Sequence, residues 1–274
     1  MINFEQYLAE RTGSSAGQQT KRKVNIEELK QMIANKDSSI ANVDVSEITS
    51  MSALFKNSDF GGSWTADLSE WDTSKVEDMS WMFEGCKNLK EVSLPHTENV
   101  TNMVGEFFGC KELTKIDLPH IDKVKNMTNM FEGCEGLKEI ILSHTESVTN
   151  MNSMFRRCKE LTKVELSHTG KVEDMRFMFR DCTKLEEVSL PHTENVVDMG
   201  GMFYGCKDLT KVELPHTKKV ADMSWMFEGC ENLEQNFFSW DITNVNKKYD
   251  MFKGCAKMKQ AKKNKINLYP KGYK

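Results

Sequence analysis

Cysteine recurs in this chain at an almost constant interval, and that interval limits the folds the chain can adopt. Cys86, Cys110, Cys134, Cys158, Cys182, Cys206 and Cys230 follow one another every 24 residues, and Cys255 comes after 25. The six histidines keep the same spacing: His96, His120, His144, His168, His192 and His216. A fixed period in the twenties indicates stacked repeats, each contacting only its neighbours. The sequence therefore predicts one elongated solenoid.

Each repeat, or rung, starts at a valine and carries apolar residues at fixed positions. Valine is position 1, Met is position 4, Met-Phe are 7 and 8, Cys is 11, Leu is 14, Val or Ile is 17 and Leu is 19. Asp or Asn at position 3 and Gly at position 10 resemble helix start and stop signals, so a short helix is predicted over positions 4–9. Alternation at 17 and 19 predicts a short parallel strand. The fold class is thus an α/β repeat of about eight rungs.

The rungs divide the chain into four predicted parts. Residues 1–23 are expected to be a flexible N-terminal segment. Residues 24–47 hold an amphipathic capping helix, begun by Asn25, and a lead-in. The solenoid runs over 48–255, with an irregular first rung at Ile48 and a partial last rung at Val245. Residues 256–274 form a Lys-rich C-terminal tail.

Composition narrows the classes of partner and compartment. The chain has a net charge of −4, yet residues 247–274 contain ten lysines and one aspartate. The rest is acidic, so nucleic-acid binding is not expected except through the tail. Neither a membrane span nor a signal peptide is predicted, which favours a cytoplasmic or virion-associated protein. The alternative is the cell surface, reached by an export route that the sequence does not show.

The segment Phe83-Glu-Gly-Cys86-Lys-Asn-Leu89-Lys-Glu-Val92-Ser-Leu94-Pro95 resembles the BspA-type leucine-rich repeat of bacterial surface antigens and mycoplasma lipoproteins, which also occurs in bacteriophage proteins. Two outer segments add to the resemblance: Leu68-Ser-Glu-Trp71-Asp-Thr-Ser-Lys-Val76 and Phe238-Ser-Trp240-Asp-Ile-Thr-Asn-Val245. The resemblance implies a right-handed leucine-rich-repeat solenoid for protein recognition or adhesion, with a protein partner or host-surface ligand. The alternative function is a structural component of a larger assembly such as a bacteriophage virion.

No catalytic, metal or cofactor site is assigned, because motifs for nucleophiles, phosphate loops and metalloproteases are missing from the sequence. The cysteines are expected to be buried apolar residues, since clustered ligand spacing such as Cys-x-x-Cys does not occur. Glu106 stands where other rungs carry Met, without a sequence-based reason. No feature of the pattern assigns an oligomeric state.

Two sets of side chains are candidates for function. Aromatic residues at positions 6 and 9 are expected to be exposed and to form an interaction surface: Trp81, Phe108, Phe177, Tyr204 and Trp225. The histidine ladder either packs in a turn, which is the favoured interpretation, or binds metal or senses pH. Position 16 alternates between acid and base (Glu91, Lys115, Glu139, Lys163, Glu187, Lys211), which is interpreted as control of strand register.

Overall fold

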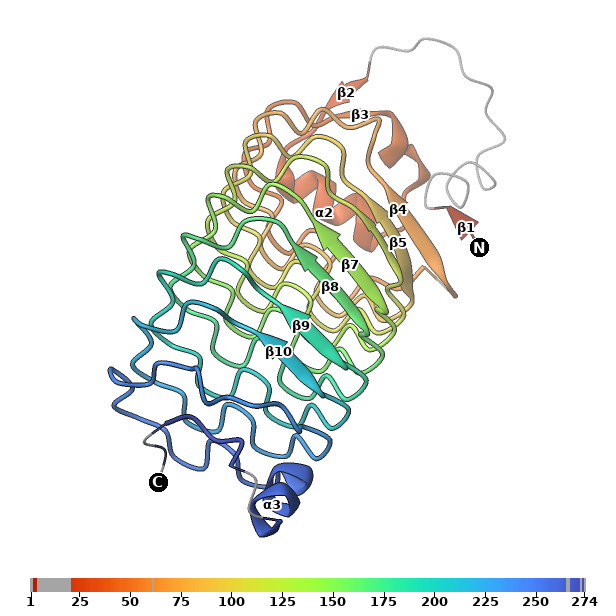
Figure 1. Cartoon of the computed structure of the whole chain (residues 1–274). Helices are drawn as coiled ribbons and strands as arrows, with labels where there is room; N and C mark the ends of the chain where they lie inside the picture. Colours follow the sequence, from red (N-terminus) through yellow and green to blue (C-terminus); the bar gives the residue numbers. More distant parts are fainter. Residues whose placement is uncertain (1, 4–20, 61, 265–266, 272, 274) are drawn as a thin grey trace.

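The chain winds into an elongated stack of turns between a helix at each end (Figure 1). The computed structural model describes residues 2–3, 21–60, 62–264, 267–271 and 273. Eight isolated parallel bridges run along one edge, from Ser50 through position 3 of every rung to Lys247. The predicted repeat solenoid is confirmed. Among the described residues, no helix is long and apolar enough to cross a membrane.

Short parallel strands line one face of the stack, and a separate pair, β2 and β3, lies at its N-terminal end (Figure 1). Their bounds are β1 Ile2–Asn3, β2 Arg22–Lys23, β3 Val43–Asp44, β4 Trp64–Asp67, β5 Leu89–Ser93, β6 Lys115–Asp117, β7 Glu139–Leu142, β8 Lys163–Leu166, β9 Glu187–Ser189 and β10 Lys211–Glu213. Hydrogen bonds join them in the orders β1-β4-β5-β6, β7-β8 and β9-β10, while β2 pairs with β3. The ladder thus breaks after β6 and after β8, once every two rungs.

The breaks coincide with the alternation of charge at position 16. Within each bonded pair a glutamate lies opposite a lysine in register: Glu91 and Lys115, Glu139 and Lys163, Glu187 and Lys211. Lys115 lies 3.8 Å from the Glu91 carboxylate. Lys163 and Lys211 instead make their ion pairs within their own strands, at 2.7 and 2.6 Å. Opposite charges therefore face each other in register, and the structural unit is a pair of rungs.

The short helix predicted over positions 4–9 is wrong: this segment is a run of consecutive turns. In the rung of Val76, the Met82 amide donates to the Met79 carbonyl at 3.2 Å, which closes a turn. The amides of Met79, Trp81 and Phe83 instead donate to carbonyls of the next rung. An α-helix would use these donors within the rung. The turns leave every second amide free to bond the neighbouring rung, and this inter-rung ladder stabilises the stack.

Position 3 begins these turns through its side chain. The Asp78 Oδ1 accepts a hydrogen bond from the Ser80 amide at 3.0 Å, an Asx turn. Position 10 ends them: Gly85 has φ 72°, a left-handed conformation that glycine adopts without steric cost. The residues interpreted as helix start and stop signals are therefore turn residues.

A column of phenylalanine rings forms the centre of the core. The position-8 rings from Phe55 to Phe252 stack with centroids 5.1–5.6 Å apart and planes within 11° of parallel. Methionines at positions 4 and 7 and the valine at position 1 are buried around them. Successive rungs thus bury equivalent side chains against one another, which is the basis of repeat-protein stability.

The eight cysteines are buried free thiols, as predicted. Each Sγ donates to the carbonyl of the Phe in the preceding rung; Cys134, for example, contacts the Phe107 oxygen at 3.1 Å. Burial raises the pKa of the Cys86 thiol to about 12. Because the thiolate is the reactive form, burial and the raised pKa both disfavour reaction of such a thiol in the folded chain.

The thiols are expected to react with Ellman's reagent far more slowly in the native chain than in denaturant. The measurement is the absorbance released over time in each condition, with all eight cysteines reacting after unfolding. Ser93→Cys, placed on the partly exposed face of β5, is the matched control and should react at once. Rapid reaction of several wild-type thiols under native conditions would contradict the burial argument.

Both ends of the stack are covered. Helix α2, Ile26–Ala34, begins at Asn25 with a capping box to Glu28 and buries Leu29, Met32 and Ile33; the 3-10 helix η1, Ser38–Asn42, follows it. At the C-terminal end of the stack, helix α3 spans Ala256–Lys263. Tyr269 and Tyr273 then meet the Phe252 ring edge-on, each at 5.2 Å. The described part of 256–274 thus packs the side chains of Met258, Ala261, Leu268, Tyr269 and Tyr273 against the solenoid core. Most of the segment 1–23 predicted to be flexible lies outside the described residues.

Candidate functional site

A groove opens next to β10, where the repeat pattern fails. Residues 234–241, all of which are described, form no strand. Gln235 takes the place of one: its Oε1 accepts from the Val212 amide and its Nε2 donates to the Val212 carbonyl, both at 2.6 Å. The side-chain amide therefore satisfies the edge of β10, and the chain beyond it is free to follow a different path.

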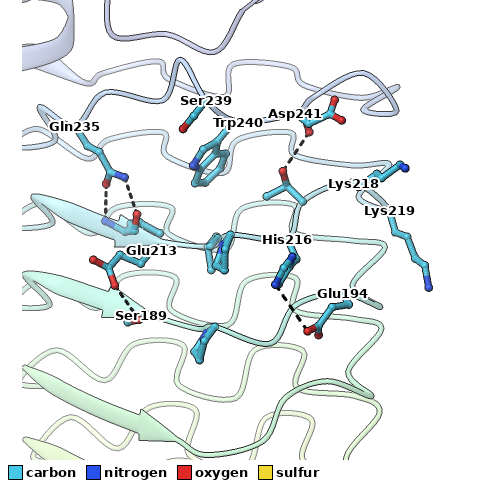
Figure 2. Close-up of a pocket in the computed structure, with 15 residues that line it drawn as sticks. Ser189, Glu194, Glu213, His216, Lys218, Lys219, Gln235, Ser239, Trp240 and Asp241 are labelled. Carbon is cyan, nitrogen blue, oxygen red and sulfur yellow. Dashed lines mark hydrogen bonds and ion pairs between the residues drawn. The ribbon is translucent and has the colours of Figure 1, made fainter.

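The groove has a volume of about 670 Å³. Its apolar wall comes from Pro191, Val212, Leu214, Pro215 and Trp240. The Trp240 indole is half-buried and is fixed edge-on against Phe237, with centroids 4.8 Å apart. Figure 2 shows the Trp240 ring between Gln235 on one side and Asp241 on the other. An apolar wall that includes a fixed aromatic ring is suited to bind an apolar side chain.

Charged groups of both signs surround this apolar wall. A hydrogen bond from Lys211, together with one from Ser189, lowers the pKa of Glu213. Hydrogen bonds from the backbone amide of Glu194 and from His192 help to lower the pKa of the Glu194 carboxyl. Both carboxylates are therefore charged at neutral pH. Lys218 and Lys219 lie at the opposite end of the groove from Glu213 and Gln235 (Figure 2).

The five aromatic residues predicted as an interaction surface lie on the turn segments and do not line this groove. Only Trp225 is exposed, at 42%; the other four are half-buried. Trp81 covers Gly105 of the next rung, where an added Cβ would come within 2.2 Å of its ring, and contacts Phe108 edge-on. The expectation that all five are exposed is thus wrong for four of them. The position 6 rings of Trp81 and Phe177 pack over a glycine of the next rung, and the position 9 rings contact Trp81 (Phe108) or Arg180 (Tyr204).

Phe177 and Tyr204 form a second such cluster, bridged by an arginine. Phe177 covers Gly201 as Trp81 covers Gly105. The Arg180 guanidinium lies 4.5 Å from the Tyr204 ring centroid and 5.4 Å from that of Phe177. These contacts stabilise neighbouring rungs through cation–π and packing interactions.

Sequence reasoning missed Trp240 and Gln235 as groove residues. A signal was available: in the rung of Val220, Asn236 replaces the position 17 aliphatic residue and Phe238 replaces the position 19 leucine. Loss of both inward-facing residues removes the strand pattern. The consequence, a groove next to β10, depends on where the displaced chain goes and is visible only in the fold.

The histidines occupy an exposed edge, and every one lies within 4.0 Å of a carboxylate. Glu98 contacts His96 and His120, Asp122 contacts His144, Glu146 contacts His168, and Glu194 contacts His192 and His216. Several of these acids belong to the preceding rung.

One known protein family matches the chain in three overlapping segments. The family described as "Mycoplasma protein of unknown function, DUF285" matches residues 15–118, 101–212 and 173–268. No curated protein is significantly similar to the chain.

Three solved structures show the range of structural similarity. A leucine-rich repeat protein of T. pallidum is 24% identical, with a TM-score of 0.46 over 72% of this chain and 79% of that one. One from Bacteroides ovatus is 18% identical, with a TM-score of 0.43 over 77% and 69%. A leucine-rich cell surface protein of Faecalibacterium prausnitzii is 16% identical, with a TM-score of 0.31 over 72% and 78%.

Proposed function

The chain belongs to the family described as Mycoplasma protein of unknown function, DUF285, and we propose that it is a non-catalytic recognition solenoid that binds an extended segment of a partner protein next to Trp240. The observation that carries the proposal is the groove of about 670 Å³ with one apolar wall and charges of both signs around it. Grooves of this size accommodate a few side chains.

The chemistry of the groove favours a polypeptide over a nucleic acid. Nucleic acid requires a run of basic residues to neutralise phosphates, whereas Glu194 and Glu213 place negative charge inside this groove. A peptide can place an apolar side chain against Trp240 while its own acidic and basic groups meet Lys218 and Glu213. Mixed charge around an apolar centre is the usual anatomy of protein interfaces.

The proposal is tested by selecting binders from a displayed library of random peptides against the full chain. Selected peptides are expected to share an apolar residue flanked by charges. Ser189→Trp, which places an indole in the groove, should weaken their binding about 10-fold or more, a loss of at least about 1.4 kcal/mol. Equal binding to wild type and to Ser189→Trp would overturn the proposal.

The repeat supplies a matched control for this experiment. Ser93 on β5 occupies the same position of its rung as Ser189 does on β9, but it does not line the groove. Ser93→Trp is therefore expected to bind the selected peptides as tightly as the wild type does. A comparable loss in both variants would show that the peptides bind the whole strand face and not the groove.

The other functional predictions stay open to direct measurement. Adhesion to a host surface and incorporation into a virion are more specific forms of partner binding, and fractionation of virions and cell surfaces distinguishes them. The aromatic residues of the turn segments remain a second predicted contact surface. Trp225, the most exposed of the five, is the residue at which Trp→Ala tests it.

A further inference from the structure

We propose that Asp122, His144 and Glu146 bind a divalent transition-metal ion such as Zn²⁺ on the histidine edge of the solenoid, apart from the groove. Each of the three offers one ligand atom, and these atoms all lie within 4.8 Å of one another. The Asp122 Oδ1 is 3.3 Å from the His144 Nδ1. A fourth donor is adjacent, because the His168 Nε2 lies 3.4 Å from the Glu146 Oε1.

The separations match what a bound zinc ion requires. Zinc takes nitrogen and oxygen ligands at about 2.0–2.2 Å in a tetrahedral arrangement, so its ligand atoms lie about 3.5 Å apart. The separation between Asp122 and His144 already has this size, as does the one between Glu146 and the adjacent His168. The ligand atoms that are still farther apart can approach one another by side-chain rotation. Rotation is available because the side chains of Asp122, His144 and Glu146 are 57%, 52% and 45% exposed.

This place in the ladder differs from the others in how closely its ligand atoms gather. His192 and His216 share a single glutamate, Glu194. His120 has Glu98 in the preceding rung and Asp122 in its own, and its ion pair to Glu98 is 4.0 Å long. Around His144, Asp122 from the preceding rung and Glu146 from its own bring their ligand atoms within 4.8 Å of the imidazole and of each other. Among the residues that the structure describes, this is the group that brings three such ligands together.

The backbone at His144 explains why the arrangement is local. In most rungs a threonine hydroxyl donates to the histidine carbonyl of the next rung, as Thr145 does to His168 at 2.7 Å. Ile121 occupies that threonine position before His144 and carries no hydroxyl. His144 has φ 62°, and no other histidine among the described residues has a positive φ. The substitution thus accompanies a distinct backbone conformation at the proposed ligand.

The donor set selects the type of ion. Imidazole together with carboxylate oxygens suits zinc and related transition metals, whereas calcium and magnesium take oxygen ligands. The thiols do not compete for the ion because all eight are buried in the folded state. With three ligands from Asp122, His144 and Glu146, a zinc ion on this edge would keep a fourth position for water or for His168.

The test is calorimetric titration of Zn²⁺ alone into the full chain, prepared without a histidine tag. One zinc ion per chain is expected to bind wild type. His144→Ala or Asp122→Asn should weaken zinc binding about 100-fold. This is the upper end of the loss in affinity when a residue that only supports a metal ligand is replaced. The variants should keep the wild-type melting temperature without metal, because the three side chains are exposed.

His192→Ala is the matched control, since His192 occupies the same position two rungs later but has a single carboxylate contact. It should bind zinc with wild-type affinity. No saturable zinc binding by wild type, or equal weakening by His144→Ala and His192→Ala, would overturn the proposal. Peptide binding in the groove is measured separately, so failure here leaves the recognition function untouched.

Discussion

Phe155→Ala is expected to lower the free energy of unfolding by about 3–5 kcal/mol, the range for deleting a buried aromatic ring. The Phe155 ring is fully buried and stacks between Phe131 at 5.6 Å and Phe179 at 5.5 Å. Its removal leaves a cavity in the middle of the column. The neighbouring rings cannot move in to fill it, because the inter-rung ladder of turn hydrogen bonds holds each rung at its spacing.

Urea denaturation followed by circular dichroism measures this loss. Ile141→Ala is the control, because Ile141 lies on the strand face of a neighbouring rung and is 59% exposed. Its effect should stay within about 0.5 kcal/mol, as for most surface substitutions. A loss below about 1 kcal/mol for Phe155→Ala would mean that the column relaxes around the missing ring, contrary to the rigid stacking described above.

Glu106→Met is expected to raise the free energy of unfolding by about 1–3 kcal/mol, the cost of a buried polar group without a partner. Glu106 has no exposed surface, and neither of its carboxylate oxygens has a hydrogen-bond partner among the described residues. Met82 and Met130 occupy the equivalent position in the two adjacent rungs. Methionine therefore fits the site and removes the unsatisfied group. Equal stability of wild type and Glu106→Met would contradict this account.

The same residue makes stability depend on pH in a defined direction. Burial, followed by the negative charge of Asp78, raises the pKa of the Glu106 carboxyl well above its ordinary value. The folded state therefore holds a proton that the unfolded chain releases. The stability that the folded state gains by holding this proton is fully present below the carboxyl pKa of the unfolded chain. It is lost as pH rises toward the raised pKa of the folded state.

Thermal or urea unfolding across this pH range compares wild type with Glu106→Met, which cannot titrate at this position. The advantage of Glu106→Met should grow as pH rises from about 4 to 7. Glu77→Met, at an exposed site one rung earlier, should show no comparable trend. A constant difference between wild type and Glu106→Met at every pH would mean that Glu106 keeps the same proton in both states.

The repeat period accounts for how much of the fold was predictable. Residues that recur every 24 positions must occupy equivalent places in successive rungs, so the buried thiols, the phenylalanine column and the short strands follow from spacing alone. The alternation of Glu and Lys at position 16 was interpreted as control of strand register, and the two residues do lie opposite each other in three bonded strand pairs. Spacing could not distinguish a helix from a run of turns, because Asp or Asn before and Gly after begin and end both.

By itself, the sequence determined the solenoid, its register and the composition of its core, since these depend on which residue types recur at one interval. The tertiary structure alone decided the local geometry: turns in place of helices, Trp81 and Phe177 packed over glycines, and a groove where the chain leaves the strand next to Gln235. It also placed Asp122 against His144. Each of these features joins residues of different rungs, and the distances between such residues are set by how rungs stack and not by their spacing along the chain.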